Sequence, residues 1–237
     1  MSSCYFIWKG ENSNKYGILE RLPLDLRAER VTQIIDMPNS MPIVYQTKAF
    51  KAQQCVLNFG LRDTSDKNIS EINNWLSGTG ELIFSNDLDK YYKAVCFGAM
   101  QGTRMVQDLG KLSVNFTVMP GKYALSNEWE EVHFEDNDDA WIPYAGTLEA
   151  EPTIKLYGNG TMKFRWSYNM IDIEIRNVSE YCIIDIPSRR VYDKNGNVIL
   201  NETIGDLMRI EMYGPSTWLK RNQNIDRMEI KKNTRWL

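Results

Sequence analysis

The stretch from Asn68 to Ala94 constrains the fold more than any other, because it joins a helical period, two glycines and a strand pair. Ser70 offers a side-chain oxygen for an N-terminal cap, and the apolar spacing predicts a helix over 69–77. Gly78 and Gly80 follow, and glycine supplies the backbone freedom with which helices often end. One face of this helix collects the apolar side chains Ile69, Ile72, Trp75 and Leu76.

The same stretch continues as a predicted β-hairpin. Glu81–Phe84 has the composition of a strand, 85–89 is rich in turn residues, and Lys90–Ala94 begins the returning strand. Trp75 is the largest apolar side chain on the helix, so we expect it to anchor the helix on this hairpin.

Two further strands of the first half show the period of a half-buried sheet. The segment 112–118 alternates apolar and polar side chains in strict order, and 52–61 places one apolar side chain at every second position near its end. The first half, residues 1–125, is therefore predicted to be a mainly antiparallel β domain, a sheet or barrel with one short helix.

The second half, residues 151–237, contains short strands separated by turn signals. Gly158–Gly160 and Lys194–Asn197 have turn compositions, and 171–175 alternates isoleucine with acidic residues. Short strands at this spacing are typical of a β-sandwich. With 43% hydrophobic residues, a chain of 237 residues can bury cores in two small domains or one large domain.

Residues 126–150 carry eight acidic and no basic side chains, in a chain of net charge −3. A solvated linker between the two domains explains this composition. The run Asp136, Asn137, Asp138 and Asp139 offers oxygen ligands, but it lacks the spacing and distal Glu of a calcium loop. We therefore expect no metal site here, and the single histidine, His133, has no neighbours that suggest catalysis.

Several functional classes are disfavoured by composition. The cysteines lie far apart without a C-x-x-C pair, which predicts buried thiols and neither a zinc cluster nor a disulfide frame. No basic face indicates nucleic-acid binding, and no apolar run is long enough to span a membrane. The first residues lack the basic start and apolar segment of a signal peptide.

Two kinds of ligand chemistry remain open. Paired carboxylates among Asp172, Glu174 and Asp185 are candidates for a glycan hydrolase, although strand alternation favours a wetted sheet face for the first two. Trp166 and Tyr168 share one face of a strand and are candidates for stacking on a sugar. Core packing is the competing interpretation for this aromatic pair, and we favour it.

Three parts of the chain together resemble a known family. The central segment has Trp75-Leu76, the glycine pair, a Leu-x-Phe strand and the turn Asp-x-x-Lys-Tyr-Tyr-x-Ala. The start, Tyr5–Gly10 with Ser13 and Gly17, and the closing Arg235-Trp236 fit the same pattern. This ordered set resembles the siphophage distal tail protein (Dit) family, in a short form without an inserted carbohydrate-binding module.

The resemblance implies a structural protein without enzymatic activity or cofactor. It implies a ring-forming N-terminal β domain and a galectin-like C-terminal β-sandwich, assembled as a homo-hexamer at the distal end of the virion tail. The implied partners are the major tail tube protein, the tail-tip protein and receptor-binding or baseplate proteins, with assembly in the bacterial host cytoplasm. A carbohydrate-binding module, or a hydrolase acting on surface polysaccharide, is the alternative.

The segment 27–50 is our predicted oligomer interface. Its apolar content is high for a loop that contains two prolines, and such content suits a surface covered by a partner. Packing of the segment on its own domain is an equally weighted alternative. The side chains assigned to the interface are Met37, Met41, Ile43, Val44 and Tyr45.

Overall fold

The computed structural model describes residues 4–23, 26, 28–38, 40–97, 101–106, 109–166 and 170–237. The protein is mainly β and divides into two compact units. The first comprises Met1–Leu125 with Leu237, and the second comprises Ser126–Trp236.

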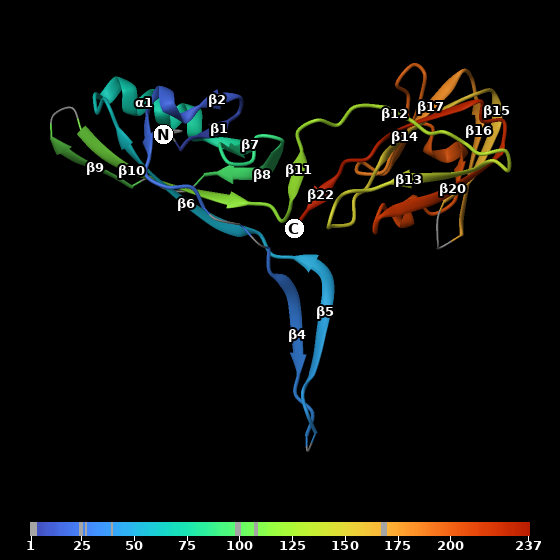
Figure 1. Cartoon of the computed structure of the whole chain (residues 1–237), viewed down its shortest axis with the longest axis horizontal. Coiled ribbons are helices and arrows are strands. Elements are labelled where there is room, and N and C mark those ends of the chain that lie inside the picture. The colour runs from blue at the N-terminus through green and yellow to red at the C-terminus, as the bar shows by residue number, and fades with distance from the viewer. Residues whose placement is uncertain are drawn as a thin grey trace. The chain divides into compact units, whose positions relative to one another are not determined.

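The first unit is built on an antiparallel sheet with strand order β2-β1-β7-β8-β10-β6-β3 (Figure 1). β9 pairs with β10, and β11 pairs with β8. The strands are β1 (Phe6–Trp8), β2 (Glu11–Asn12), β3 (Gly17–Leu19), β4 (Arg30–Ile35), β5 (Ile43–Phe50), β6 (Gln53–Leu61), β7 (Gly78–Phe84), β8 (Lys90–Cys96), β9 (Gln101–Val106), β10 (Leu109–Val118) and β11 (Lys122–Ala124); a 3-10 turn spans Ser13–Lys15.

Helix α1 (Asp66–Leu76) supplies three buried side chains to the core of this unit: Ile72, Trp75 and Leu76. The helix begins three residues before the predicted start, because the Oγ of Ser65 accepts the backbone N–H of Asn68 at 3.4 Å. The predicted cap, Ser70, lies inside the helix and donates to the carbonyl of Asp66. The assignment of Ser70 as the cap was therefore wrong.

The predicted hairpin is confirmed as β7 and β8, which pair antiparallel from Gly78 opposite Cys96 to Leu82 opposite Tyr92. Gly78 begins β7 with φ +105 and so provides the left-handed backbone after the helix. Gly80 serves a different purpose, because a Cβ there would lie 2.7 Å from the Lys9 Cγ. The alternation along β6 and β10 is also confirmed, with these side chains buried: Cys55, Leu57, Phe59, Leu61, Leu112, Val114, Phe116 and Val118.

The second unit is a β-sandwich of two five-stranded sheets. We call them the β14 sheet, with order β12-β21-β14-β17-β18, and the β15 sheet, with order β13-β20-β15-β16-β19. The strands of these sheets are β12 (Glu130–Glu131), β13 (Asp139–Pro143), β14 (Thr153–Tyr157), β15 (Gly160–Trp166), β16 (Ile171–Val178), β17 (Tyr181–Asp185), β18 (Arg190–Asp193), β19 (Thr203–Ile204), β20 (Ser216–Gln223) and β21 (Arg227–Lys231); 3-10 turns span Leu200–Glu202 and Leu207–Arg209. The last strand, β22 (Arg235–Trp236), belongs to neither of these two sheets.

The inward side chains of both sheets form one continuous core. Its largest fully buried members include Trp166, Phe164, Ile154 and Leu156. The acidic stretch 126–150, which we expected to be a linker, lies in this unit and contributes β12 and β13 to its two sheets. Its acidic side chains are compatible with strand formation because they occupy exposed or half-buried positions, whereas Val132, Ala140 and Ile142 are buried.

Candidate interaction surface

The strands β4 and β5 form a two-stranded hairpin that is separate from the main sheet of the first unit (Figure 1). Ile35 lies opposite Ile43, and Gln33 lies opposite Tyr45. Among the strands that the structure describes, β4 and β5 pair only with each other. An isolated two-stranded hairpin is at best marginally stable in water, so this one calls for further support.

Contacts at the base of the hairpin hold its two strands together. Lys51 donates its backbone N–H to the Glu29 carbonyl at 2.8 Å, and the two side chains form an ion pair at 2.9 Å. The Arg30 guanidinium lies 5.0 Å from the centre of the Phe50 ring. These contacts are at the end nearest the sheet, so they do not cover the apolar side chains farther along.

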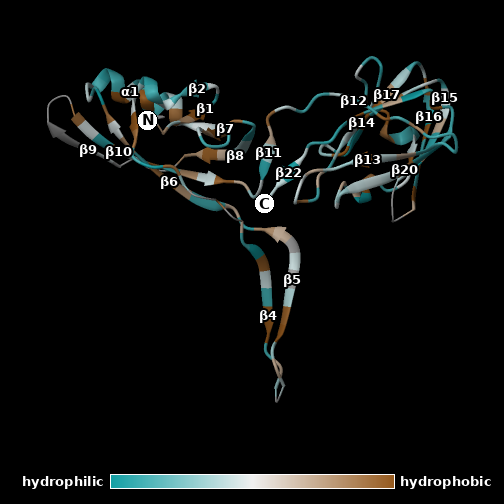
Figure 2. Cartoon of the chain, viewed as in Figure 1, coloured by the Kyte–Doolittle hydropathy of each residue, from teal (hydrophilic) through white to brown (hydrophobic). Residues whose placement is uncertain are grey.

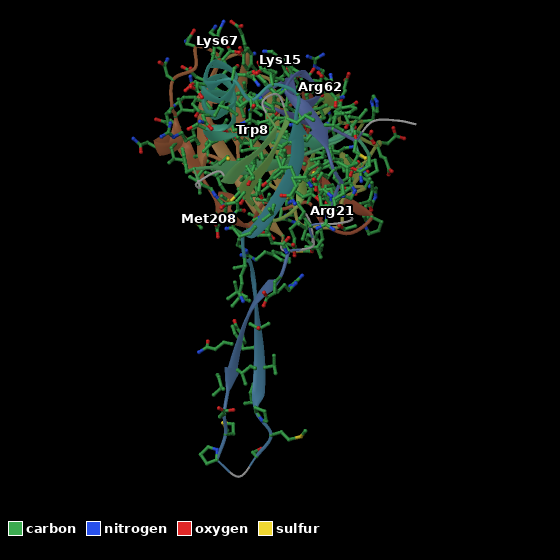
Figure 3. The ribbon with its side chains drawn as sticks, turned by 90° about the vertical axis from the view of Figure 1, so that its left-hand side faces the viewer. Trp8, Lys15, Arg21, Arg62, Lys67 and Met208 are labelled. Carbon is green, nitrogen blue, oxygen red and sulfur yellow. The ribbon has the colours of Figure 1, made fainter. Side chains whose placement is uncertain are left out.

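The distal part of the hairpin is apolar and exposed. Figure 2 colours much of this part hydrophobic, and Figure 3 draws its side chains standing clear along both strands. Met41 is 85% exposed and Ile34 is 64% exposed. All five side chains predicted for the interface are exposed: Met37, Met41, Ile43, Val44 and Tyr45. In this structure, these side chains therefore do not pack against their own domain.

Sequence reasoning did not assign Ile34 and Ile35 to the interface. Both are exposed and lie opposite Val44 and Ile43, respectively. The apolar side chains of β4 follow no regular period, so the sequence does not show which residues of β4 lie opposite those of β5. Opposite strands with a known register would have brought these isoleucines into the same patch.

Trp166 does not provide a sugar platform, because its ring is only 1% exposed. Its indole N–H donates to the Glu211 carbonyl at 3.2 Å, which satisfies the one polar atom of the buried ring. Core packing, the competing interpretation, is correct for this residue. The other predicted stacking residue, Tyr168, lies outside the described residues.

The candidate hydrolytic carboxylates belong to ion pairs or to a turn. Asp172 accepts two hydrogen bonds from Arg165, at 2.7 and 3.0 Å, which hold the pKa of its carboxyl below the usual range. Hydrogen bonds from Arg176 and Lys163 do the same for the pKa of Glu174. A general acid needs a raised pKa, so neither carboxyl is suited to donate a proton near neutral pH.

Asp185 lies in a different sheet from these two carboxylates. It lies on β17 of the β14 sheet, whereas Asp172 and Glu174 lie on β16 of the β15 sheet. Its carboxylate accepts a hydrogen bond from the Ser188 hydroxyl at 2.5 Å. Asp185 therefore does not share a sheet face with Asp172 or Glu174, and it forms no carboxylate pair with either of them on such a face.

The acidic run of the second unit pairs with cations of the protein itself. Asp138 receives a hydrogen bond from Arg221 at 2.7 Å, and Asp139 lies 3.4 Å from the Lys220 ammonium. Asn137 donates to the other oxygen of Asp139. Within the described residues, no group of three or more His, Cys, Asp or Glu side chains is arranged to hold a metal ion. His133 is exposed.

All four cysteines are free, with Cys4 half-buried and the other three buried. Burial raises the pKa of the Cys55 thiol to about 11 and that of Cys182 to about 12. Both groups are therefore protonated and unreactive at neutral pH. No helix among the described residues is long and apolar enough to cross a membrane.

Comparison with known proteins gives a structural match and no sequence match. No protein-family model matches the chain, and no curated protein sequence matches it significantly. The solved structure of the SPP1 Dit protein superposes with a TM-score of 0.76 at 12% identity, over 97% of this chain and 98% of that one. That protein is described as a paradigm of the hub adsorption apparatus in phages that infect Gram-positive bacteria. The agreement extends over both units, and it shows that this chain has a Dit-like fold.

Proposed function

We propose that this protein is a structural component of a siphophage tail and acts as a hub at its distal end. The observation that carries the proposal is the Dit-like fold over 97% of the chain, together with the exposed apolar hairpin. The protein that shares the fold is described as part of a hub adsorption apparatus.

The proposed assembly is a hexameric ring. A cyclic ring requires two different surfaces on each protomer, one meeting the other on the neighbouring copy. The β4–β5 hairpin is our candidate for one of these surfaces, since its apolar side chains are exposed in the single chain. Burial of such side chains against a neighbour contributes roughly 25 cal/mol for each Å² of apolar surface removed from water.

The proposed partners follow from the position of a hub between tail and tip. The ring would join the major tail tube protein to the tail-tip protein and to receptor-binding or baseplate proteins. The sandwich of the second unit would act as a galectin-like scaffold for these attachments. Assembly would take place in the bacterial host cytoplasm, before the finished protein becomes part of the virion tail.

Light scattering on the purified protein across a concentration series tests the ring. We expect a mass six times the 27.6 kDa of one chain. Replacing Met41 and Tyr45 together by Asp places two charges in the apolar patch, and we expect the six-fold mass to be lost. Circular dichroism should show an unchanged β content, because both side chains are exposed in the single chain.

Met208→Asp provides a matched control. Met208 is 67% exposed but lies in the second unit, on a 3-10 turn (labelled in Figure 3). This variant should keep the six-fold mass. A wild-type monomer at every concentration would reject self-assembly into a ring, and an unaltered ring in the Met41→Asp/Tyr45→Asp variant would reject the hairpin as its interface.

A further inference from the structure

Two tryptophans occupy opposite register positions on the outer surface of the β15 sheet. Trp141 on β13 lies directly opposite Trp218 on β20. Their strand neighbours Ala140, Ile142 and Leu219 are buried, so the alternation of side chains turns both indoles away from the core. Trp141 is 54% exposed and Trp218 is half-buried, which leaves an aromatic surface open to solvent.

A row of four charged side chains crosses the same face beside the tryptophans. The register places Asp139 opposite Lys220, Lys220 opposite Arg165, and Arg165 opposite Asp172. Asp139 and Lys220 are two residues along their strands from Trp141 and Trp218, a spacing of about 7 Å. The charged row is therefore within reach of a ligand of one or two rings that rests on the indoles.

The charges of this row are paired and balanced. Arg165 forms a two-pronged ion pair with Asp172, and Lys220 lies 3.4 Å from Asp139. Two acidic and two basic groups leave no net charge to attract an ionic ligand. They also disfavour a broad protein contact, because the buried centre of a protein interface is depleted in charged residues. A neutral ligand with one apolar face and several hydroxyl groups matches both the tryptophan pair and the charged row.

We propose that the outer face of the β15 sheet binds a neutral hexose polymer. The C–H face of a pyranose ring stacks on Trp141 and Trp218, while its hydroxyls accept hydrogen bonds from Lys220 and Arg165, whose side chains are partly exposed. The paired charges hold these groups in place before the ligand arrives, which lowers the entropy lost on binding. This site is distinct from buried Trp166, and it is independent of ring formation by the hairpin.

Affinity electrophoresis in native gels tests the proposal with the full-length protein. Dextran, glycogen, yeast mannan, galactomannan and hydroxyethyl cellulose are the probes, since they are soluble, neutral hexose polymers. We expect at least one of them to retard the wild-type protein in a saturable manner. Trp141→Ala and Trp218→Ala should each weaken the retardation by about tenfold or more, equivalent to about 1.4 kcal/mol.

Met208→Ala is the control, because it removes an exposed apolar side chain of the same unit that is not on this sheet. It should leave the retardation unchanged. Thermal unfolding of each variant checks that the sandwich remains folded. Absence of retardation by all five polymers would overturn the proposal. Retardation that survives both tryptophan substitutions in folded protein would also overturn it. Light scattering on the same variants should show unaltered mass, so failure here is distinguishable from failure of the ring.

Discussion

Trp8 and Trp75 bond each other's backbone through their indole rings. The Trp8 indole N–H donates to the Trp75 carbonyl at 3.0 Å, and the Trp75 indole N–H donates to the Trp8 carbonyl at 3.1 Å. Strand β1 and the end of helix α1 are thereby joined although they are 67 residues apart. These two hydrogen bonds satisfy both indole N–H groups, which would otherwise be buried without a partner.

Replacing Trp75 by Phe tests this reciprocal pair. The new ring can keep the stacked contact with Phe6, whose centre lies 5.6 Å from that of Trp75, but the Trp8 carbonyl loses its donor. We expect a loss of about 1–3 kcal/mol in the stability of the first unit. Hydrogen exchange of peptides from 1–125 in the full chain measures this loss. Trp141→Phe, in the second unit, should leave those peptides unchanged.

Helix α1 provides a matched pair of serine substitutions. Ser65→Ala removes the cap of the Asn68 N–H and should reduce stability by about 1 kcal/mol. The Ser70 hydroxyl donates to the Asp66 carbonyl, which is already part of the helix backbone. Because alanine also has a higher helix propensity than serine, Ser70→Ala should leave stability unchanged or slightly higher. Exchange rates of the helix amides would distinguish the two. Equal effects would contradict the position of the cap.

Gly17 lies against the backbone of β6. A Cβ at this position would stand 2.2 Å from the Gly60 carbonyl oxygen, and a backbone atom cannot move aside as a side chain can. Gly17→Ala should therefore cost about 2 kcal/mol or more. Gly60→Ala is the comparison, because its Cβ would meet no atom closer than 4.0 Å. Urea titration of both variants, followed by exchange of the β3 and β6 amides, measures the difference.

The carboxylate of Asp87 links β8 to β11. Burial favours its neutral form, but Lys90 and Lys122 bond the two oxygens at 2.9 and 3.1 Å and outweigh that effect, so the Asp87 pKa lies below its ordinary value. A lowered folded pKa adds stability that is present above the unfolded pKa and is lost as the pH falls through the folded one. The first unit should therefore lose stability below about pH 4.

Asp87→Asn tests this dependence. The variant should be less stable by about 1–2 kcal/mol at pH 7, and its stability should change less between pH 5 and 3 than that of the wild type. Hydrogen exchange across this pH range, corrected for the intrinsic exchange rate, reports the first unit separately. The same acid dependence in wild type and variant would show that Asp87 is not its source. Asp172→Asn, an exposed ion-pair residue of the second unit, is the control.

Strand alternation was the most reliable guide in the sequence. Along 112–118 every second side chain is apolar, and a period of two has one physical solution, a sheet with one face buried. The isoleucines at 171, 173 and 175 are buried for the same reason, with Asp172 and Glu174 outside in ion pairs. The helix was also predictable, but its start was not, since Ser65 and Ser70 are both plausible caps.

The burial of individual tryptophans could not be predicted from the sequence alone. Trp166 and Trp141 each lie in a strand, yet the first is in the core and the second is 54% exposed. Composition treats both as large apolar residues, and the short apolar context of 139–143 shows no clear period. The pairing of β13 with β20 determines which face each residue occupies, and that pairing joins segments about eighty residues apart by register.

The sequence by itself determined the β class, the position of the helix and hairpin, the faces of the regular strands and the apolar character of the hairpin side chains. Those properties follow from local periods and residue types. Only the tertiary structure decided that the acidic stretch joins the sandwich, that the β4–β5 hairpin is left uncovered and that Trp141 lies opposite Trp218. Each of these depends on which distant strands pair, and pairing is selected by the free energy of the whole core and not by any local segment.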